Sequence, residues 1–99
     1  MSNAIELSTF KLKKTTSVPE FLLISEKFQR EFLSIQRGYI SRKLIYNDKE
    51  WADLVLWETM EDAKNAMAVC QESAVVLEYF TYFDLKSSKF THFYVKEEY

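Results

Sequence analysis

Stretches in which apolar and polar residues alternate predict four β-strands in this chain. The first covers residues 4–13, and apolar side chains such as Leu7 and Phe10 fall on both of its faces. The polar residues 47–50 read as a turn that joins two further strands into an antiparallel hairpin. These two strands are expected at residues 39–46 and 51–57, and the last strand at residues 90–95.

The segment after the first strand predicts an amphipathic helix that runs to about Gln36. Ser17 and Glu20 have the spacing of a capping box, and Pro19 falls in the first turn. Gly38 stands where a left-handed residue would end the helix. The apolar side of the helix recurs at steps of three and four residues and consists of Phe21, Leu22, Ser25, Phe28, Phe32 and Ile35.

A second helix is predicted after Thr59, because Thr59 and Asp62 repeat the capping pattern. Its predicted inner face is built mainly from small side chains: Met60, Ala63, Ala66, Met67 and Cys70. Residues 73–85 are ambiguous, since their β-branched and aromatic side chains suit a strand about as well as a buried helix. We favour a short third helix in this segment.

The predicted order of elements is that of a ferredoxin-like α+β fold, βαββαβ, with an extra short helix before the last strand. We expect residues 1–99 to form one such domain, with both main helices on one face of a four-stranded antiparallel sheet. Leu54, Val55, Leu56, Trp57 and Phe93 place apolar side chains on both faces of the strands. Because the helices cover one face, a second copy of the chain is expected to cover the other, giving a homodimer.

Composition argues against several classes of partner. The 13 basic and 15 acidic residues give a formal net charge of −2, so nucleic acid and anionic membrane surfaces are not expected partners. No apolar run approaches the roughly 20 residues that span a bilayer. The single cysteine cannot form an internal disulfide, and the first residues lack the pattern of a signal peptide, so we expect a cytoplasmic protein.

Residue types that several common chemistries require are missing. One glycine excludes a glycine-rich phosphate loop, and one cysteine with one histidine excludes a zinc cluster, so neither a metal nor an organic cofactor is expected. Cys70 and His92 are interpreted as a buried helix cysteine and a strand histidine, because no third group is available to orient them as nucleophile and base. The lysines at positions 11, 13 and 14 are interpreted as a solvated rim, with steering of an anionic ligand as the alternative.

Residues 54–63, Leu-Val-Leu-Trp-Glu-Thr-Met-Glu-Asp-Ala, resemble the third strand and capped second helix of the dimeric α/β barrel superfamily, in particular its antibiotic biosynthesis monooxygenase-like branch. Phe-Lys-Leu-Lys at 10–13 and Gly-Tyr-Ile at 38–40 extend the resemblance over nearly the whole chain. The resemblance implies a dimer whose sheets pack face to face, with a pocket between sheet and helices in each protomer. Members include cofactor-independent oxygenases of aromatic quinol-like substrates, haem-degrading enzymes and proteins with no known reaction.

The resemblance does not extend to the residues of the haem-degrading members. Those members are expected to carry Asn, Trp and His where this chain has Ser8, Met67 and Val76. The sole histidine, His92, belongs to the last predicted strand. We therefore do not expect haem binding or degradation.

Two functional hypotheses remain open. The first is a cofactor-independent monooxygenase or related enzyme acting on a small aromatic molecule, and the second is a non-catalytic small-molecule-binding or structural dimeric domain. Both place an apolar, aromatic-lined pocket between sheet and helices, although the same side chains could fill this space. The residues predicted to bind a ligand there are Ser8, Phe28, Trp57, Tyr79 and His92, with Arg42 as a further polar candidate.

Overall fold

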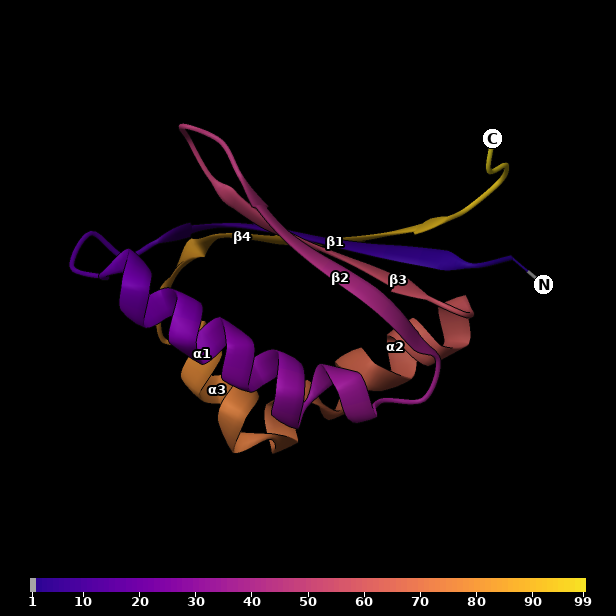
Figure 1. Cartoon of the computed structure of the whole chain (residues 1–99), viewed down its shortest axis with the longest axis horizontal. Coiled ribbons are helices and arrows are strands. Elements are labelled where there is room, and N and C mark those ends of the chain that lie inside the picture. Colours follow the sequence, from indigo (N-terminus) through magenta and orange to yellow (C-terminus); the bar gives the residue numbers. More distant parts are fainter. Residues whose placement is uncertain (1) are drawn as a thin grey trace.

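The computed structural model describes residues 2–99 and has the predicted ferredoxin-like α+β fold. Its antiparallel sheet has the strand order β2-β3-β1-β4. The three α-helices lie on one face of this sheet, and the other face is uncovered (Figure 1). The strands are β1 (Ala4–Leu12), β2 (Tyr39–Tyr46), β3 (Trp51–Trp57) and β4 (Phe83–Tyr94), and the helices are α1 (Val18–Glu31), α2 (Met60–Val69) and α3 (Ala74–Phe80).

Side-chain caps start all three α-helices, and the caps of α1 and α2 are the predicted ones. The Thr59 hydroxyl accepts a 3.0 Å hydrogen bond from the amide of Asp62, and Ser17 accepts a longer one of 3.5 Å from the amide of Glu20. Ser73 caps α3 in the same manner, so the ambiguous segment begins as a helix and its last residues join β4. A cap satisfies backbone donors that have no partner within the helix.

The predicted end of the first helix is wrong. The α-helix stops at Glu31, and the 3-10 turn η1 (Leu33–Ile35) follows. The tighter turn rotates the chain, so that Leu33 is buried whereas Ile35 is 73% exposed. Leu22 is also exposed, and Ile24 takes its place in the core. Gly38 does adopt the predicted left-handed conformation, with φ +81°, at the entry to β2.

The last strand is longer than predicted and begins at Phe83. Its pairing with β1 shifts register between Thr9 and Lys11. At this irregularity the Ser87 hydroxyl accepts from the amide of Lys11 at 2.8 Å and donates to the carbonyl of Asp84 at 2.6 Å. Ser87 and Ser88, which precede the predicted start of the strand at residue 90, therefore lie in a bulge within it.

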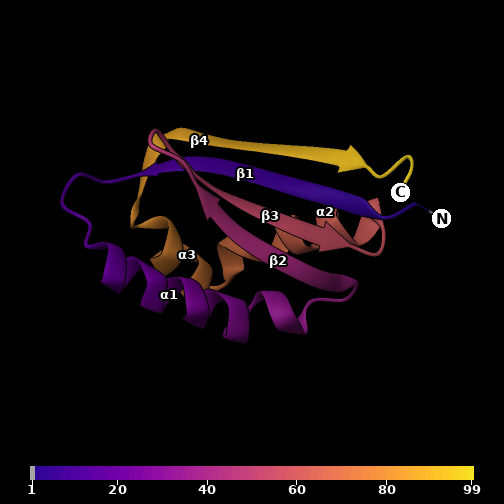
Figure 2. The same ribbon diagram turned by 45° about the horizontal axis from the view of Figure 1, so that its top comes forward.

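The two faces of the sheet differ in what covers them. Side chains on the helix-covered face, including Phe10, Val55 and Trp57, belong to the buried core. The turned view separates the strands and shows α1 and α3 beneath the sheet (Figure 2). The uncovered face carries an apolar surface formed by Ile5, Leu7, Ile45, Leu54, Leu56 and Phe93. Across residues 2–99, no helix is long and apolar enough to cross a membrane.

Candidate functional site

A cleft lies between the helix-covered face of the sheet and the helices that pack on it. It contains a cavity of about 40 Å³. Its walls are largely apolar, and its polar groups are the side chains of Glu6, Ser8, Asp53, Cys70 and Tyr79. The apolar residues that border it include Phe28, Phe32, Val55, Trp57, Met67, Phe80, Phe83 and Phe90. An apolar cleft with few polar groups is the usual composition of a small-molecule site.

The structure brings together four of the five predicted ligand-binding residues. Ser8, Phe28, Trp57 and Tyr79 line the cleft, whereas His92 lies beside it on β4. Arg42, the further polar candidate, is engaged in a buried ion pair instead. A cavity of about 40 Å³ holds a group the size of one or two water molecules, while a benzene-sized ligand needs about 150 Å³. The protein's own aromatic rings therefore fill most of the predicted pocket.

Two phenylalanines contact each other where the cleft lining reaches solvent, here called the mouth of the cleft. Phe80 of α3 and Phe90 of β4 both line the cleft, and their rings meet edge to face with centroids 6.3 Å apart. Phe90 is 46% exposed, so one side of its ring already faces solvent. The contact joins two different elements and involves no hydrogen bond. Separation of these two rings would therefore break no hydrogen bond between them.

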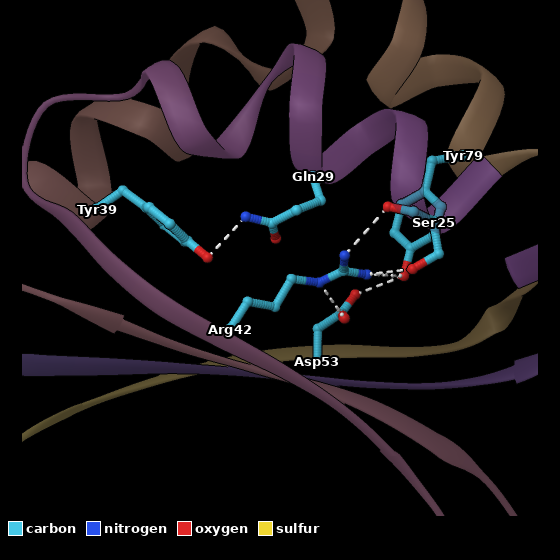
Figure 3. Close-up of polar contacts among 6 residues, drawn as sticks. All are labelled: Ser25, Gln29, Tyr39, Arg42, Asp53 and Tyr79. Atoms are coloured by element: carbon cyan, nitrogen blue, oxygen red, sulfur yellow. Dashed lines mark hydrogen bonds and ion pairs between the residues drawn. The ribbon is translucent and has the colours of Figure 1, made fainter. Parts of the chain in front are cut away.

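Arg42 and Asp53 form the centre of a buried polar network (Figure 3). The Arg42 guanidinium donates to Asp53 Oδ1 at 2.7 Å and to the Ser25 hydroxyl at 2.8 Å. It also donates to the Tyr79 hydroxyl at 2.9 Å, and Tyr79 in turn donates to Asp53 Oδ2 at 2.6 Å. These contacts join β2, β3, α1 and α3, and hence fix two helices to the sheet.

The electrostatics of this network favour a structural role. Burial opposes the charge on Arg42, but Asp53 and Tyr79 more than compensate and raise its pKa. Burial and the neighbouring Asp53 raise the pKa of Tyr79 well above its ordinary value, so the phenol stays protonated. The Asp53 carboxylate is thus held between a permanent cation and a hydroxyl donor. Both of its oxygens therefore already accept hydrogen bonds within the network.

Glu6 is the other carboxyl group of the cleft and has a different environment. Its side chain is 13% exposed. Burial raises its pKa to about 7, Asp53 adds to the rise, and the Trp57 indole opposes it. The nearest basic group is His92, whose Nε2 lies 3.5 Å from Glu6 Oε2 without the geometry of a hydrogen bond. Glu6 can therefore both bind and release a proton near neutral pH.

Two nitrogens beside Glu6 make no hydrogen bond of normal geometry among the residues that the structure describes, although the nearby indole of Trp57 lowers the pKa of Glu6. They are the indole N–H of the fully buried Trp57 and Nε2 of His92. Burial and the positive charge of Lys64 lower the pKa of His92, so its imidazole is neutral near pH 7. Burial followed by the charge of Glu6 raises the pKa of Cys70 to about 11, so its thiol is a poor nucleophile.

Sequence reasoning overlooked Glu6, Asp53 and Cys70 as lining residues. A signal for Glu6 was present, because it lies two residues before Ser8 and therefore on the same face of β1. The same alternation places Asp53 two residues before Val55 and four before Trp57, on the inner face of β3. Within residues 2–99, no group of three or more His, Cys, Asp and Glu side chains lies where it could hold a metal ion.

A wider groove of about 880 Å³ lies at the end of the sheet near the β2–β3 turn. Its rim includes the three lysines of the basic run, at positions 11, 13 and 14, together with Asp48, Glu50 and Asp84. The mixed charges and open shape are those of a solvated surface, consistent with the interpretation of these lysines as a rim. The enclosed cleft, with its buried titratable group, is the better candidate for a functional site.

Comparison with known proteins identifies the class of fold. No protein-family model matches the chain, and no curated protein matches its sequence. Solved structures do match. SnoaB, a cofactor-independent oxygenase from Streptomyces nogalater, is 15% identical over 100% of this chain and 96% of its own, with a TM-score of 0.65. The monooxygenase from the gene ActVA-Orf6 of Streptomyces coelicolor, solved in complex with Nanaomycin D, is 11% identical over 99% and 91%, with a TM-score of 0.74.

A dimeric ferredoxin-like protein from an uncultured marine organism is also similar, at 12% identity over 100% of this chain and 92% of that one, with a TM-score of 0.64. The chain thus has the fold that the sequence resemblance predicted, the fold of antibiotic biosynthesis monooxygenase-type structures. At these identities the similarity concerns the backbone, and activity has to be argued from the cleft itself.

Proposed function

We propose that this protein is a cofactor-independent oxygenase, or a related enzyme, that acts on a small aromatic molecule in the cleft between sheet and helices. The observation that carries the proposal is the combination of aromatic walls with one buried carboxyl group, Glu6, whose pKa of about 7 suits proton transfer. The structural similarity to SnoaB, described as a cofactor-independent oxygenase, supports the same class of reaction.

The reaction is the oxidation of an electron-rich hydroxyaromatic substrate by dioxygen. A substrate CH₂ group and O₂ give a carbonyl group and water, so the substrate carbon supplies all four electrons that reduce O₂ and both hydrogens of the water. Loss of a proton from the substrate makes it easier to oxidise, and the cleft supplies the group to receive that proton. The surrounding rings exclude water and hold a flat molecule in a fixed orientation.

We further propose that the protein acts as a homodimer through the uncovered sheet face. Leu7 pairs with Leu54, and Ile5 lies opposite both Leu56 and Phe93, which makes a continuous apolar surface across three strands. Surfaces of this kind on soluble proteins commonly mark an interface. A dimer would leave the cleft on the opposite face accessible to its ligand.

The alternative is a non-catalytic small-molecule-binding or structural dimeric domain, and the small cavity of about 40 Å³ favours it. In this hypothesis Phe80 and Phe90 stay together and the aromatic side chains serve as packing. The raised pKa of Glu6 then has no function in proton transfer.

Oxygen uptake with anthrone, 1,4-naphthohydroquinone and 1-naphthol distinguishes these hypotheses. The proposal expects a rate of oxygen uptake that is proportional to protein concentration. Ser8→Phe, whose larger side chain should fill the cleft, should abolish this uptake. The circular dichroism spectrum of Ser8→Phe should remain that of the wild type, which shows that the variant is folded. Absence of uptake, with a thermal shift by the same compounds that Ser8→Phe removes, would establish the binding domain. Absence of both effects would leave the structural domain.

A further inference from the structure

The group formed by Glu6, Trp57 and His92 is a buried polar cluster with incomplete hydrogen bonding. The Trp57 side chain is 0% exposed, and its N–H lies close enough to the Glu6 carboxylate to lower the pKa of Glu6, yet it makes no hydrogen bond of normal geometry among the described residues. A buried donor without a well-formed hydrogen bond destabilises the folded state, and such groups in folded proteins commonly serve a ligand or an ordered water. Trp57 lines the same small cavity as Glu6, so a single bound oxygen atom could contact both.

We propose that Glu6 and the indole N–H of Trp57 together bind the hydroxyl group of a phenol- or naphthol-type ligand, with Glu6 accepting the hydroxyl proton and Trp57 donating a hydrogen bond to the resulting oxyanion. In this step the ligand O–H bond breaks and a new O–H bond forms on the Glu6 carboxylate. The negative charge moves to the ligand oxygen, and no electrons are transferred. The inference rests on the proposed function and names the part of the substrate that the cleft recognises.

The charged and titratable groups around Glu6 fit this assignment. Asp53 of β3 is occupied by Arg42 and Tyr79, and it disfavours a second negative charge nearby. Cys70 of η2 (Cys70–Glu72) keeps its proton. Burial, and after it the charge of Lys64 of α2, lowers the pKa of His92 of β4, so its imidazole is neutral near pH 7. Glu6 therefore lacks a permanent cationic partner among the described residues, which leaves its charge free to be neutralised by a ligand proton.

The size of the cavity agrees with binding of a hydroxyl group. About 40 Å³ accommodates an oxygen atom but not a ring. The ring would lie at the mouth, in the space that opens when Phe80 and Phe90 separate. Aromatic faces from these two residues could then stack on the ligand.

The test compares 1-naphthol with 1-methoxynaphthalene, which has the same rings but no hydroxyl hydrogen. At about pH 8 the wild type should bind 1-naphthol roughly 10 to 100 times more tightly than the ether, the ratio that a charge-assisted hydrogen bond supplies. Glu6→Gln should reduce this ratio to near one without changing the affinity for the ether, and Trp57→Phe should reduce it in part. Glu58→Gln, which alters an exposed carboxylate just after β3, is the matched control and should leave it unchanged.

The wild type provides a second measurement that does not depend on the folding of any variant. Its preference for 1-naphthol should weaken as the pH falls through about 7, where Glu6 becomes protonated, while ether binding stays constant. Equal affinity for both ligands, or a preference that survives Glu6→Gln, would overturn the assignment of Glu6 and leave the aromatic site intact. Failure of both ligands to bind would overturn the proposed function together with this inference.

Discussion

The hydroxyl of Tyr79 donates a 2.6 Å hydrogen bond to Asp53, which links a residue of α3 to a strand 26 positions earlier in the chain. Asp53 also receives the Arg42 guanidinium, whose face lies 5.0 Å from the centre of the Phe28 ring. The network fills the space between sheet and helices at this point with satisfied polar groups. It fixes the position of α3, and hence that of Phe80 at the mouth of the cleft.

Asp53→Ala should lower the free energy of unfolding by about 3–5 kcal/mol, because it leaves the Arg42 guanidinium buried without its counter-ion. Urea unfolding at fixed protein concentration measures the loss. Asp48→Ala, in the exposed β2–β3 turn, is the control and should change stability by less than about 0.5 kcal/mol. A small effect at both positions would show that the ion pair does not stabilise the fold.

Gly38→Ala should destabilise the protein for two separable reasons. A left-handed backbone costs a residue with a Cβ atom about 1–2 kcal/mol, and at φ +81° Gly38 adopts that conformation. The new methyl group would also overlap the carboxylate of Asp62 at the start of α2. Thermal denaturation of Gly38→Ala and of Gly38→Ala with Asp62→Ala separates the two costs. If the double variant regained the full thermal stability of the wild type, the left-handed backbone conformation of residue 38 would contribute nothing to the loss of stability in Gly38→Ala.

Glu6 should make the protein less stable as the pH rises. Its folded pKa of about 7 exceeds the ordinary value of 4.5, so the folded state holds the proton more tightly than the unfolded state. Stability should therefore decline between about pH 4.5 and pH 7 and level off above, by at most about 3 kcal/mol.

Urea unfolding of wild type and Glu6→Gln across this range isolates that contribution. The lowered pKa of His92 changes stability in the opposite direction, because the stability that it contributes is lost as the pH falls. Both proteins contain His92, so the comparison between them isolates the contribution of Glu6. Glu6→Gln should match or exceed the wild type above about pH 7. Parallel profiles for the two proteins would show that Glu6 titrates normally.

The sequence predicted the fold well because its signals are local. The predicted caps at Ser17 and Thr59 start the first two helices, and alternation with a polar turn defines the central hairpin. The errors arose where a boundary depends on contacts distant in the chain. Ser87 looks like a loop residue, and it remains within β4 because its hydroxyl bonds to the backbone of Lys11, 76 positions away.

The candidate site was less predictable for the same reason. Alternation places Glu6 and Ser8 on one face, but the pKa of Glu6 depends on which helix covers it and on the distance to Asp53. The sequence indicated Arg42 and Tyr79 as polar candidates. No local pattern, however, shows that Arg42 donates a hydrogen bond to Tyr79 and that Tyr79 donates one to Asp53. The volume left by seven or more packed rings likewise follows from tertiary packing, which the sequence pattern does not contain.

Leu54→Asp should convert the proposed dimer into a monomer, because it places a charge at the centre of the apolar surface on the uncovered face. Light scattering after size exclusion should give twice the chain mass for the wild type and the chain mass for the variant. Leu23→Asp, on the exposed side of α1, is the control and should remain dimeric. A wild type with the mass of one chain, 11.8 kDa, would contradict the proposed interface.

The most direct measurement of the central claim is the response of the two tryptophan indole N–H signals in a ¹H–¹⁵N correlation spectrum to added 1-naphthol. Trp57 lines the cleft, whereas Trp51 packs against Phe21 and Tyr46 outside it. Trp51→Phe assigns the signals by removing one of them. A ligand between sheet and helices should shift the Trp57 signal saturably and leave that of Trp51 nearly unchanged. An unchanged Trp57 signal under conditions where 1-naphthol binds would place the ligand elsewhere and contradict the account.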